Sequence, residues 1–220
     1  MCFSATASFA TAAVTGSIGL LTIGRARTWT EIPLAAVPLL FAAQQAIEGV
    51  LWLTLGTGPS TMLTGVLANT FAVFALMLWP LWSPLAVGLA EPDRTRRALI
   101  FVVFAAAVPL AIYGAMNISA NPYGACIVRH SISYANGHPY ANLALAAYGI
   151  CTCLPPLLSS YRSLRWFGVF VVAGLAVSTA FFLFTAFSVW CFFAAAGSLA
   201  IFGHYARLPS LAALEARIAR

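Results

Sequence analysis

Residues 44–52, Gln44-Gln45-Ala46-Ile47-Glu48-Gly49-Val50-Leu51-Trp52, place a carboxylate in the middle of a long apolar run. The run covers residues 32–55 and is long enough for a membrane-spanning helix, which needs about 20 residues. Glu48 is the only acidic residue inside any apolar run of the chain. An unpaired carboxylate in hydrocarbon costs roughly 3 kcal/mol or more. On a helix Gln44, Glu48 and Trp52 lie along one face, so we expect that face to contact protein or water and not lipid.

The composition is that of an integral membrane protein. The 220 residues are 62% hydrophobic and 7% charged, with a mean hydropathy of +0.93, whereas soluble domains have roughly 25% charged residues. The net charge of +6 comes from 11 Arg residues without any Lys, spread thinly between apolar runs. Nucleic-acid binding needs a basic cluster on one soluble face, so this class is excluded. The lipid bilayer is the predicted partner, and a protein partner or a homo-oligomer is left open.

Seven apolar segments can cross a hydrocarbon core of about 30 Å as helices. The run from Trp166 to Tyr205 would form a single helix of about 60 Å and must therefore fold back. We place the turn at residues 185–188, with Ser188 as the N-cap of the last helix. The chain is thus predicted to be an all-α polytopic bundle over residues 1–206, followed by an amphipathic cytoplasmic tail over residues 207–220. The predicted spans lie near residues 4–24, 32–55, 62–83, 97–116, 140–158, 166–184 and 187–206.

The Arg residues determine the predicted orientation. Ten of the eleven fall on one side of these spans, at positions 25, 27, 94, 96, 97, 162, 165, 207, 217 and 220. By the positive-inside rule that side is cytoplasmic, so the N-terminus lies outside a plasma (inner) membrane and the C-terminus inside. Arg129 is the exception, because it belongs to the outer loop 117–139, which is apolar enough to form a lid over the helix ends. A count of six or eight helices would scatter the Arg residues onto both sides.

Most residues that can carry chemistry fall on the outer side in this topology. Glu48 lies about 10 Å below the outer end of its helix, and Cys191 lies in the first turn of the last one. Cys2 precedes the first span, and the outer loop contains further Cys, His and Arg side chains. We therefore predict a polar pocket that opens outward. Its predicted residues are Gln44, Gln45, Glu48, Trp52, Arg129 and Trp190, with Cys2, Cys126, Cys191, His130 and His138 as metal-binding or redox residues.

Three interpretations of this pocket remain open. Thiolate, imidazole and carboxylate ligands suit a transition metal such as copper or zinc, although no local motif such as Cys-x-x-Cys is present. Outside the cytoplasm, two of Cys2, Cys126 and Cys191 are able to form a disulfide, either structural or exchangeable. In the third interpretation the cysteines are small packing residues, and Glu48 is held by neighbouring amides or by Arg129.

Several other features have structural interpretations. Trp79-Pro80 and Trp82-Ser83-Pro84 are typical of an aromatic belt at the membrane interface. Cys151 and Cys153 point about 160° apart on a helix, so we predict packing roles for both. A retinal-binding rhodopsin is excluded, because a Schiff base needs a lysine and the chain has none.

Three motifs carry a resemblance to known sequences. They are the opening Met1-Cys2-Phe3-Ser4-Ala5, the motif Gln44-Gln45-x-x-Glu48-Gly49-x-x-Trp52, and Ser188-Val189-Trp190-Cys191-Phe192-Phe193-Ala194-Ala195. Over its full length the chain resembles a family of uncharacterised prokaryotic multi-pass membrane proteins that begin with Met-Cys-Phe-Ser-Ala. The resemblance implies a fold and a membrane location and transfers no catalytic role. It singles out Cys2, Glu48 and Cys191.

These observations support three functional hypotheses and leave open whether the protein is an enzyme. In the first, the outer pocket binds a transition metal or carries out thiol redox chemistry. In the second, the protein is a small-solute carrier or channel in which Glu48 takes up a proton, which requires a polar path below that residue. In the third, it is a non-catalytic membrane scaffold or sensor subunit.

Overall fold

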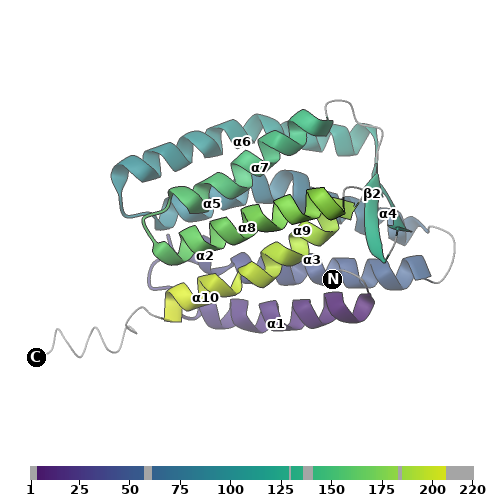
Figure 1. Cartoon of the computed structure of the whole chain (residues 1–220), viewed down its shortest axis with the longest axis horizontal. Coiled ribbons are helices and arrows are strands. Elements are labelled where there is room, and N and C mark those ends of the chain that lie inside the picture. Colours follow the sequence, from purple (N-terminus) through teal and green to yellow (C-terminus); the bar gives the residue numbers. More distant parts are fainter. Residues whose placement is uncertain (1–3, 57–60, 129, 136–140, 183–184, 207–220) are drawn as a thin grey trace, which may run out of the picture.

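The chain folds into a bundle of helices whose long axes run in nearly the same direction (Figure 1). The computed structural model describes residues 4–56, 61–128, 130–135, 141–182 and 185–206. Within these ranges, six helical segments are long and apolar enough to cross a membrane. A further apolar helix, α7 (Ala141–Leu158), is shorter. The six segments are Ala5–Ile23, Ile32–Gly56, Met62–Ala90, Arg94–Ala120, Arg162–Phe181 and Ala186–Ala206.

Three of these segments are single helices, namely α1 (Ala5–Ile23), α6 (Arg94–Ala120) and α8 (Arg162–Phe181). The other three are each made of consecutive helices. The second consists of α2 (Ile32–Ala35) and α3 (Val37–Gly56). The third consists of α4 (Met62–Val73), the π-helical stretch η1 (Phe74–Leu78) and α5 (Trp79–Ala90), and the last consists of α9 (Ala186–Gly197) and α10 (Leu199–Ala206).

The π-helical stretch η1 ends two residues before a proline. Pro80 has no N–H group, and its ring would clash with the carbonyl of the residue four positions earlier in a regular α-helix. The wider hydrogen-bonding pattern of Phe74–Leu78 removes this conflict and allows the segment to continue as α5. Trp79 is thereby placed inside the bundle, where it is 5% exposed, so the prediction that it belongs to an interfacial belt is wrong.

The loop after α6 contains two short strands, which the prediction of an all-α chain did not include. β1 (Gly124–Val128) and β2 (Ser131–Ala135) pair antiparallel, with Ile127 opposite Ile132. The hairpin lies across one end of the bundle (Figure 1). The ring of Tyr134 stacks on Phe71 of α4 at 4.2 Å, and Ile132 is fully buried. Aromatic and β-branched residues favour such half-buried strands.

The start of the last segment also differs from the prediction. α9 begins at Ala186, and Thr185 occupies the N-cap position without a side-chain hydrogen bond to the helix. The prediction that Ser188 caps this helix is wrong, because its hydroxyl bonds across the bundle to Glu48. Cys191 accordingly lies in the second turn of the helix and not in the first.

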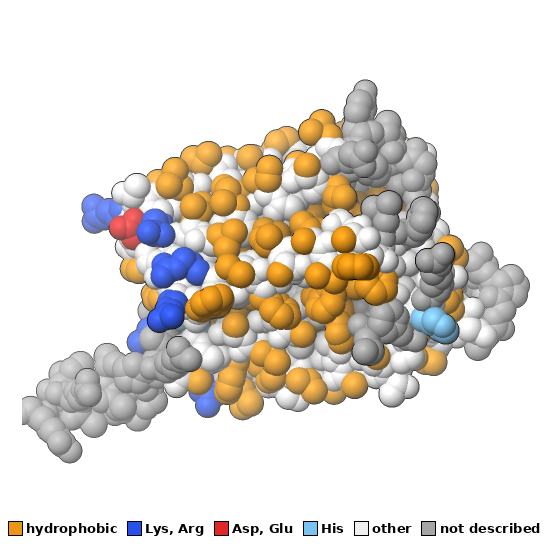
Figure 2. Space-filling view, viewed as in Figure 1, with side chains coloured by type: hydrophobic (Ala, Val, Ile, Leu, Met, Phe, Trp, Pro, Cys, Tyr) orange, Lys and Arg blue, Asp and Glu red, His pale blue; other side chains and the backbone are white. Residues whose placement is uncertain are grey.

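The described Arg side chains gather at the end of the bundle opposite the hairpin. Figure 2 shows this basic end separated from the hairpin end by a broad surface of hydrophobic side chains. The Arg residues follow α1 or begin α6 and α8, so helix connectivity brings them to one end. We call this the Arg end; its described members are Arg25, Arg27, Arg94, Arg96, Arg97, Arg162 and Arg165.

Glu91 joins two chain connections at the Arg end. Its side chain follows α5 and is 1% exposed. The carboxylate accepts hydrogen bonds from the Ser159 hydroxyl at 2.9 Å, from the Ser160 N–H at 2.9 Å, and from the Ser160 hydroxyl. Burial by itself raises the pKa of Glu91, but the hydrogen bonds from Ser160, Ser159 and the Asp93 N–H outweigh burial and lower it. The charged carboxylate therefore holds the α5–α6 connection against the α7–α8 connection.

We expect Glu91→Ala to lower the free energy of unfolding by about 2 kcal/mol at pH 7, since hydrogen bonds to charged groups contribute roughly 1.5–3 kcal/mol. The folded-state pKa of Glu91 is lowered, so its contribution is present above the unfolded pKa of roughly 4.3 and is lost as the pH falls through the folded value. The deficit of the variant should thus shrink between about pH 5 and about pH 3, as measured by thermal unfolding in detergent. Asp93→Asn is the control, because Asn caps a helix as well as Asp does; equal losses in both variants would contradict the role of Glu91.

Candidate functional site

The carboxylate of Glu48 lies inside the bundle and is 0% exposed. Side chains from two helices donate hydrogen bonds to it. The hydroxyl of Ser188, on α9, bonds to Oε1, and the amide of Gln45, on the same helix as Glu48, bonds to Oε2 at 3.2 Å. This buried carboxylate is therefore held both by its own helix and by a helix distant in sequence.

The neighbouring amide of Gln44 connects three helices. The indole N–H of Trp79 on α5 donates to Gln44 Oε1 at 2.7 Å, and Gln44 Nε2 lies 3.3 Å from the sulfur of Cys191 on α9. Because an indole nitrogen can only donate, its position determines that the amide oxygen faces Trp79 and the NH₂ group faces the thiol. We call these two neighbouring hydrogen-bonded groups together the polar cluster: Gln44, Trp79 and Cys191 in one, and Gln45, Glu48 and Ser188 in the other.

The polar cluster fastens α5 and α9 to α3 in a region where no bulk water can replace a lost partner. Hydrogen bonds between membrane helices contribute about 0.6 kcal/mol on average and up to roughly 1.7 kcal/mol each. An ionisable side chain left unpaired at that depth costs more. The hydrogen bonds of the cluster therefore favour this arrangement of α3, α5 and α9.

Two further polar atoms of α3 are buried beside the cluster. Gln45 Oε1 is an acceptor and Trp52 Nε1 is a donor, and neither has a hydrogen-bond partner among the residues that the structure describes. Buried groups of this kind usually have a partner, so such a pair indicates a place for water or for a polar ligand group. Trp52 itself is half-buried.

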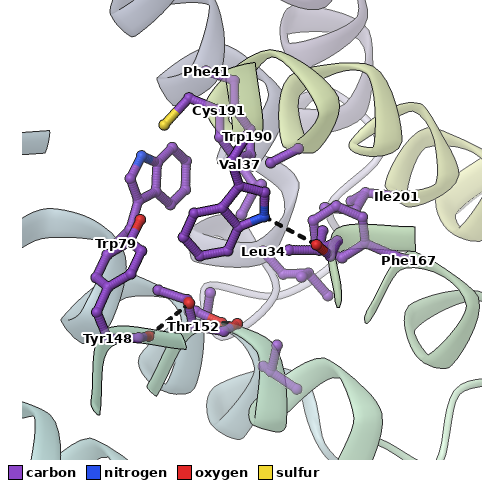
Figure 3. A pocket seen from close by; sticks show the side chains of 15 residues that line it. Leu34, Val37, Phe41, Trp79, Tyr148, Thr152, Phe167, Trp190, Cys191 and Ile201 are labelled. Carbon is purple, nitrogen blue, oxygen red and sulfur yellow. Dashed lines mark hydrogen bonds between the residues drawn. The ribbon is translucent and has the colours of Figure 1, made fainter. Parts of the chain in front are cut away.

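Between the polar cluster and the Arg end, the bundle encloses a cavity of about 50 Å³ (Figure 3). Trp79 and Cys191 belong both to the cluster and to the cavity wall. Aromatic rings form much of that wall: Phe41 stacks on Trp79 at 3.9 Å, and Tyr148 meets Trp190 edge to face at 5.0 Å. The remaining lining residues are mostly aliphatic, namely Leu34, Val37, Ala86, Val87, Val171, Ala194 and Ile201.

Few polar groups of the cavity wall are available to a ligand. The Ser83 hydroxyl donates to the carbonyl of Thr152 at 2.8 Å, and the Thr152 hydroxyl donates to the carbonyl of Tyr148 at 2.7 Å. The Trp190 N–H donates to the Val171 carbonyl, as the dashed line in Figure 3 shows. The Tyr148 hydroxyl has no hydrogen-bond partner among the described residues, and the Cys191 thiol, which accepts from Gln44, forms no disulfide. The cavity is thus apolar apart from a phenol and a thiol.

The structure separates the predicted pocket residues into three groups. Gln44, Gln45, Glu48 and Cys191 lie together in the polar cluster, and Trp190 lines the adjacent cavity. Two residues are on the hairpin instead: Cys126 is exposed, and so is His130, which adopts a left-handed backbone conformation with a φ of 67°. Cys2, Arg129 and His138 lie outside the described residues.

The predicted metal and disulfide chemistry has no support among the described residues. They contain no group of three or more His, Cys, Asp or Glu side chains that could hold a metal ion. Cys126, Cys151, Cys153 and Cys191 are free thiols, and Cys126 is exposed whereas Cys191 is buried. Cys191 is a hydrogen-bonded part of the cavity wall, and Cys151 and Cys153 are buried at 4% and 6% exposure.

Sequence reasoning missed three residues of this site. Ser188 was assigned to a helix cap and Trp79 to the membrane interface, and Tyr148 was not considered. The signals were weak, because a Ser near a helix start and a Trp before a Pro each have a more common explanation. One usable clue was available. A buried carboxylate and two amides require hydrogen-bond partners, and Ser188 lies three residues before Cys191, which was already assigned to the pocket of Glu48.

We expect Ser188→Ala to lower the free energy of unfolding by about 1–3 kcal/mol, because the buried carboxylate loses its donor from α9. Glu48→Gln should cost less, since the amide oxygen still accepts from Ser188. Ser198→Ala is the matched control, because that hydroxyl is equally buried but donates to Ala195 close by in sequence. The free energies of unfolding of the three variants are measured by titration with sodium dodecyl sulfate, with tryptophan fluorescence as the signal. A loss in Ser188→Ala no larger than that in the control would show that the bond to Glu48 does not hold the helices.

Comparison with known proteins gives a family and no activity. No curated protein and no solved structure matches the chain. Residues 1–216 match a family described as a family of unknown function, DUF6629. The match includes all three sequence motifs and every residue of the polar cluster and the cavity. The chain therefore belongs to the family DUF6629, whose function is unknown.

Proposed function

We propose that this chain is a seven-span protein of the plasma membrane that binds a small, mainly apolar molecule in the cavity beside the polar cluster. It acts as a non-catalytic sensor or scaffold subunit. The observation that carries the proposal is the cavity itself, which is lined by five helical segments and whose polar groups that donate no hydrogen bond to a described residue are the Tyr148 hydroxyl and the Cys191 thiol. An apolar pocket with a few convergent polar groups is the usual form of a small-molecule site.

The proposed topology adds α7 to the six long apolar segments. α7 has 18 residues, which lies within the range of about 17–25 found for membrane-spanning helices. Seven crossings place the two ends of the chain on opposite sides of the membrane. The positive-inside rule then makes the Arg end cytoplasmic, with the N-terminus and the hairpin outside. The concentration of the described Arg side chains at one end supports this orientation (Figure 2).

The volume and chemistry of the cavity define the ligand class. A cavity needs roughly 10–15 Å³ of probe-occupied volume to hold one water molecule, so about 50 Å³ accommodates a molecule of a few heavy atoms. Aliphatic and aromatic walls favour a hydrocarbon portion, and the phenol and the thiol favour one hydrogen-bonding group. A short-chain alcohol has both features.

The second candidate function is a carrier or channel in which Glu48 takes up a proton. The unpartnered Gln45 Oε1 and Trp52 Nε1 beside Glu48 favour it, because they indicate a place for a polar group. A carrier also needs a polar path from Glu48 to the other side. The lining residues nearer the Arg end, Leu34, Phe167 and Ile201, are apolar, so we rank the carrier second. Metal binding and thiol redox chemistry rank third.

Cysteine labelling in intact cells tests the orientation. We expect a membrane-impermeant maleimide to label Cys126, because it is exposed on the hairpin, and to leave the buried Cys151, Cys153 and Cys191 unlabelled. Mass spectrometry of the peptides identifies the labelled sites. As a control, Arg94→Cys in a Cys126→Ser background should be labelled only after the cells are permeabilised. Labelling of that cysteine in intact cells would contradict the proposed orientation and indicate the opposite one.

Cavity filling tests the ligand site. In nanodiscs, 2-bromoethanol should quench tryptophan fluorescence with a saturable component, because Trp79 and Trp190 line the cavity. Ala194→Leu and Ala86→Val should abolish this component, since both side chains line the cavity and the larger ones occupy it. Ala106→Leu, on the exposed face of α6, is the control and should leave it unchanged. Purely linear quenching in all four proteins would overturn the proposal. Thermal unfolding verifies that the filled variants remain folded, because overpacking costs about 1–3 kcal/mol.

A further inference from the structure

A groove of about 460 Å³ opens at the Arg end and shares no residue with the cavity beside the polar cluster. One wall comes from the first turns of α8 and the other from α10. The α10 wall is low, because it consists of Ala200 and Gly203. A Cβ atom added to Gly203 would meet nothing within 4 Å, so the groove is open down to the helix backbone. The α8 wall carries Arg162, Ser163 and Trp166.

The positive charge of the groove has no partner among the residues that the structure describes. Arg162 is exposed and forms no hydrogen bond or ion pair with any described residue. Arg165, one turn further along α8, instead donates to the carbonyls of Ser159 and Ser160, both at 3.1 Å. The acidic side chains described at the Arg end are engaged elsewhere: Glu31 pairs with Arg27, Glu91 binds the two serines, and Asp93 caps α6.

The start of α8 adds to the attraction of the groove for an anion. α8 begins at Arg162, and Tyr161 at the N-cap makes no side-chain hydrogen bond to the first turn. The first N–H groups of a helix have no partner within the helix and carry partial positive charge. A phosphate beside Arg162 would therefore meet both a guanidinium group, which suits phosphate oxygens, and these amides.

The groove continues into an apolar surface along α8. Trp166 is 61% exposed, and Val169 and Phe170, one turn deeper, are 48% and 44% exposed. Tryptophan is enriched at the level of lipid headgroups, and exposed aliphatic and aromatic side chains below it contact acyl chains. A free phosphate ion would use the charged part of this surface and have no use for the apolar part. A phospholipid would use both.

We propose that the groove between α8 and α10 binds the headgroup of an anionic phospholipid of the leaflet at the Arg end. Its phosphate lies beside Arg162 and the start of α8, its glycerol beside Gly203 and Trp166, and one acyl chain along Phe170. Basic pockets between membrane helices are known to bind anionic headgroups in this way. The site is independent of the ligand cavity proposed above.

Native mass spectrometry of the full chain in detergent tests this site with equal amounts of dioleoyl phosphatidylglycerol and dioleoyl phosphatidylcholine. We expect the protein to retain phosphatidylglycerol in preference to phosphatidylcholine. Arg162→Gln and Gly203→Leu should each weaken phosphatidylglycerol binding about fivefold, the first by removing one charge near the membrane surface and the second by filling the groove. Binding of phosphatidylcholine should not change.

Two controls separate the groove from a general effect of charge or of substitution. Arg94→Gln removes another exposed Arg of the same end that does not line the groove, and Gly65→Leu fills similarly open space on α4. Both should leave the preference intact. The proposal is overturned by equal retention of the two lipids, by an equal loss in Arg94→Gln, or by an unchanged preference in Gly203→Leu. Displacement of the lipid by inorganic phosphate at the same concentration would likewise overturn it in favour of a site for free anions.

Discussion

The hydrogen bond from the Ser188 hydroxyl to the Glu48 carboxylate is the contact on which the interior of this bundle depends. Both groups are fully buried, and the described donors to the carboxylate come from Gln45 on its own helix and from Ser188 on α9. The hydrogen bond between Ser188 and Glu48 determines how α9 lies against α3. The amide of Gln44 then has Cys191 on one side and Trp79 on the other. Glu48 thus joins α9 to α3, and the neighbouring Gln44 joins both α5 and α9 to α3.

The cavity follows from the same arrangement. Trp79 and Cys191 are held at its border by their bonds to Gln44, and the large rings of Tyr148 and Trp190 meet edge to face and do not fill the space between α5, α7 and α9. The polar groups that hold the helices are therefore next to the space where a ligand would bind. A change in that space would act directly on the bonds between the helices, which is the coupling that a membrane sensor needs.

Much of the architecture was predictable from the sequence. The length of each apolar segment and the positions of the Arg residues between segments can be read without knowing the tertiary contacts. Hydropathy alone predicted a helix near residues 97–116, and the structure shows α6 from Arg94 to Ala120. The burial of the Glu48 face followed from the cost of a charge in lipid. The hairpin was missed because short strands in a loop depend on a partner strand and on packing against α4. Trp79 was misplaced because its segment continues as a helix to Ala90.

The sequence by itself determined that the chain forms apolar helices long enough to cross a membrane, that Glu48 needs a partner inside the bundle, and that the Arg residues between the segments belong to one side. These properties follow from the composition of each segment and the energetic cost of charge in hydrocarbon. Only the tertiary structure decided which residue meets Glu48, that Cys191 bonds to Gln44 and not to another cysteine, and that a cavity and a groove lie between the helices. Such contacts join residues far apart in the chain, and their geometry depends on how whole helices pack.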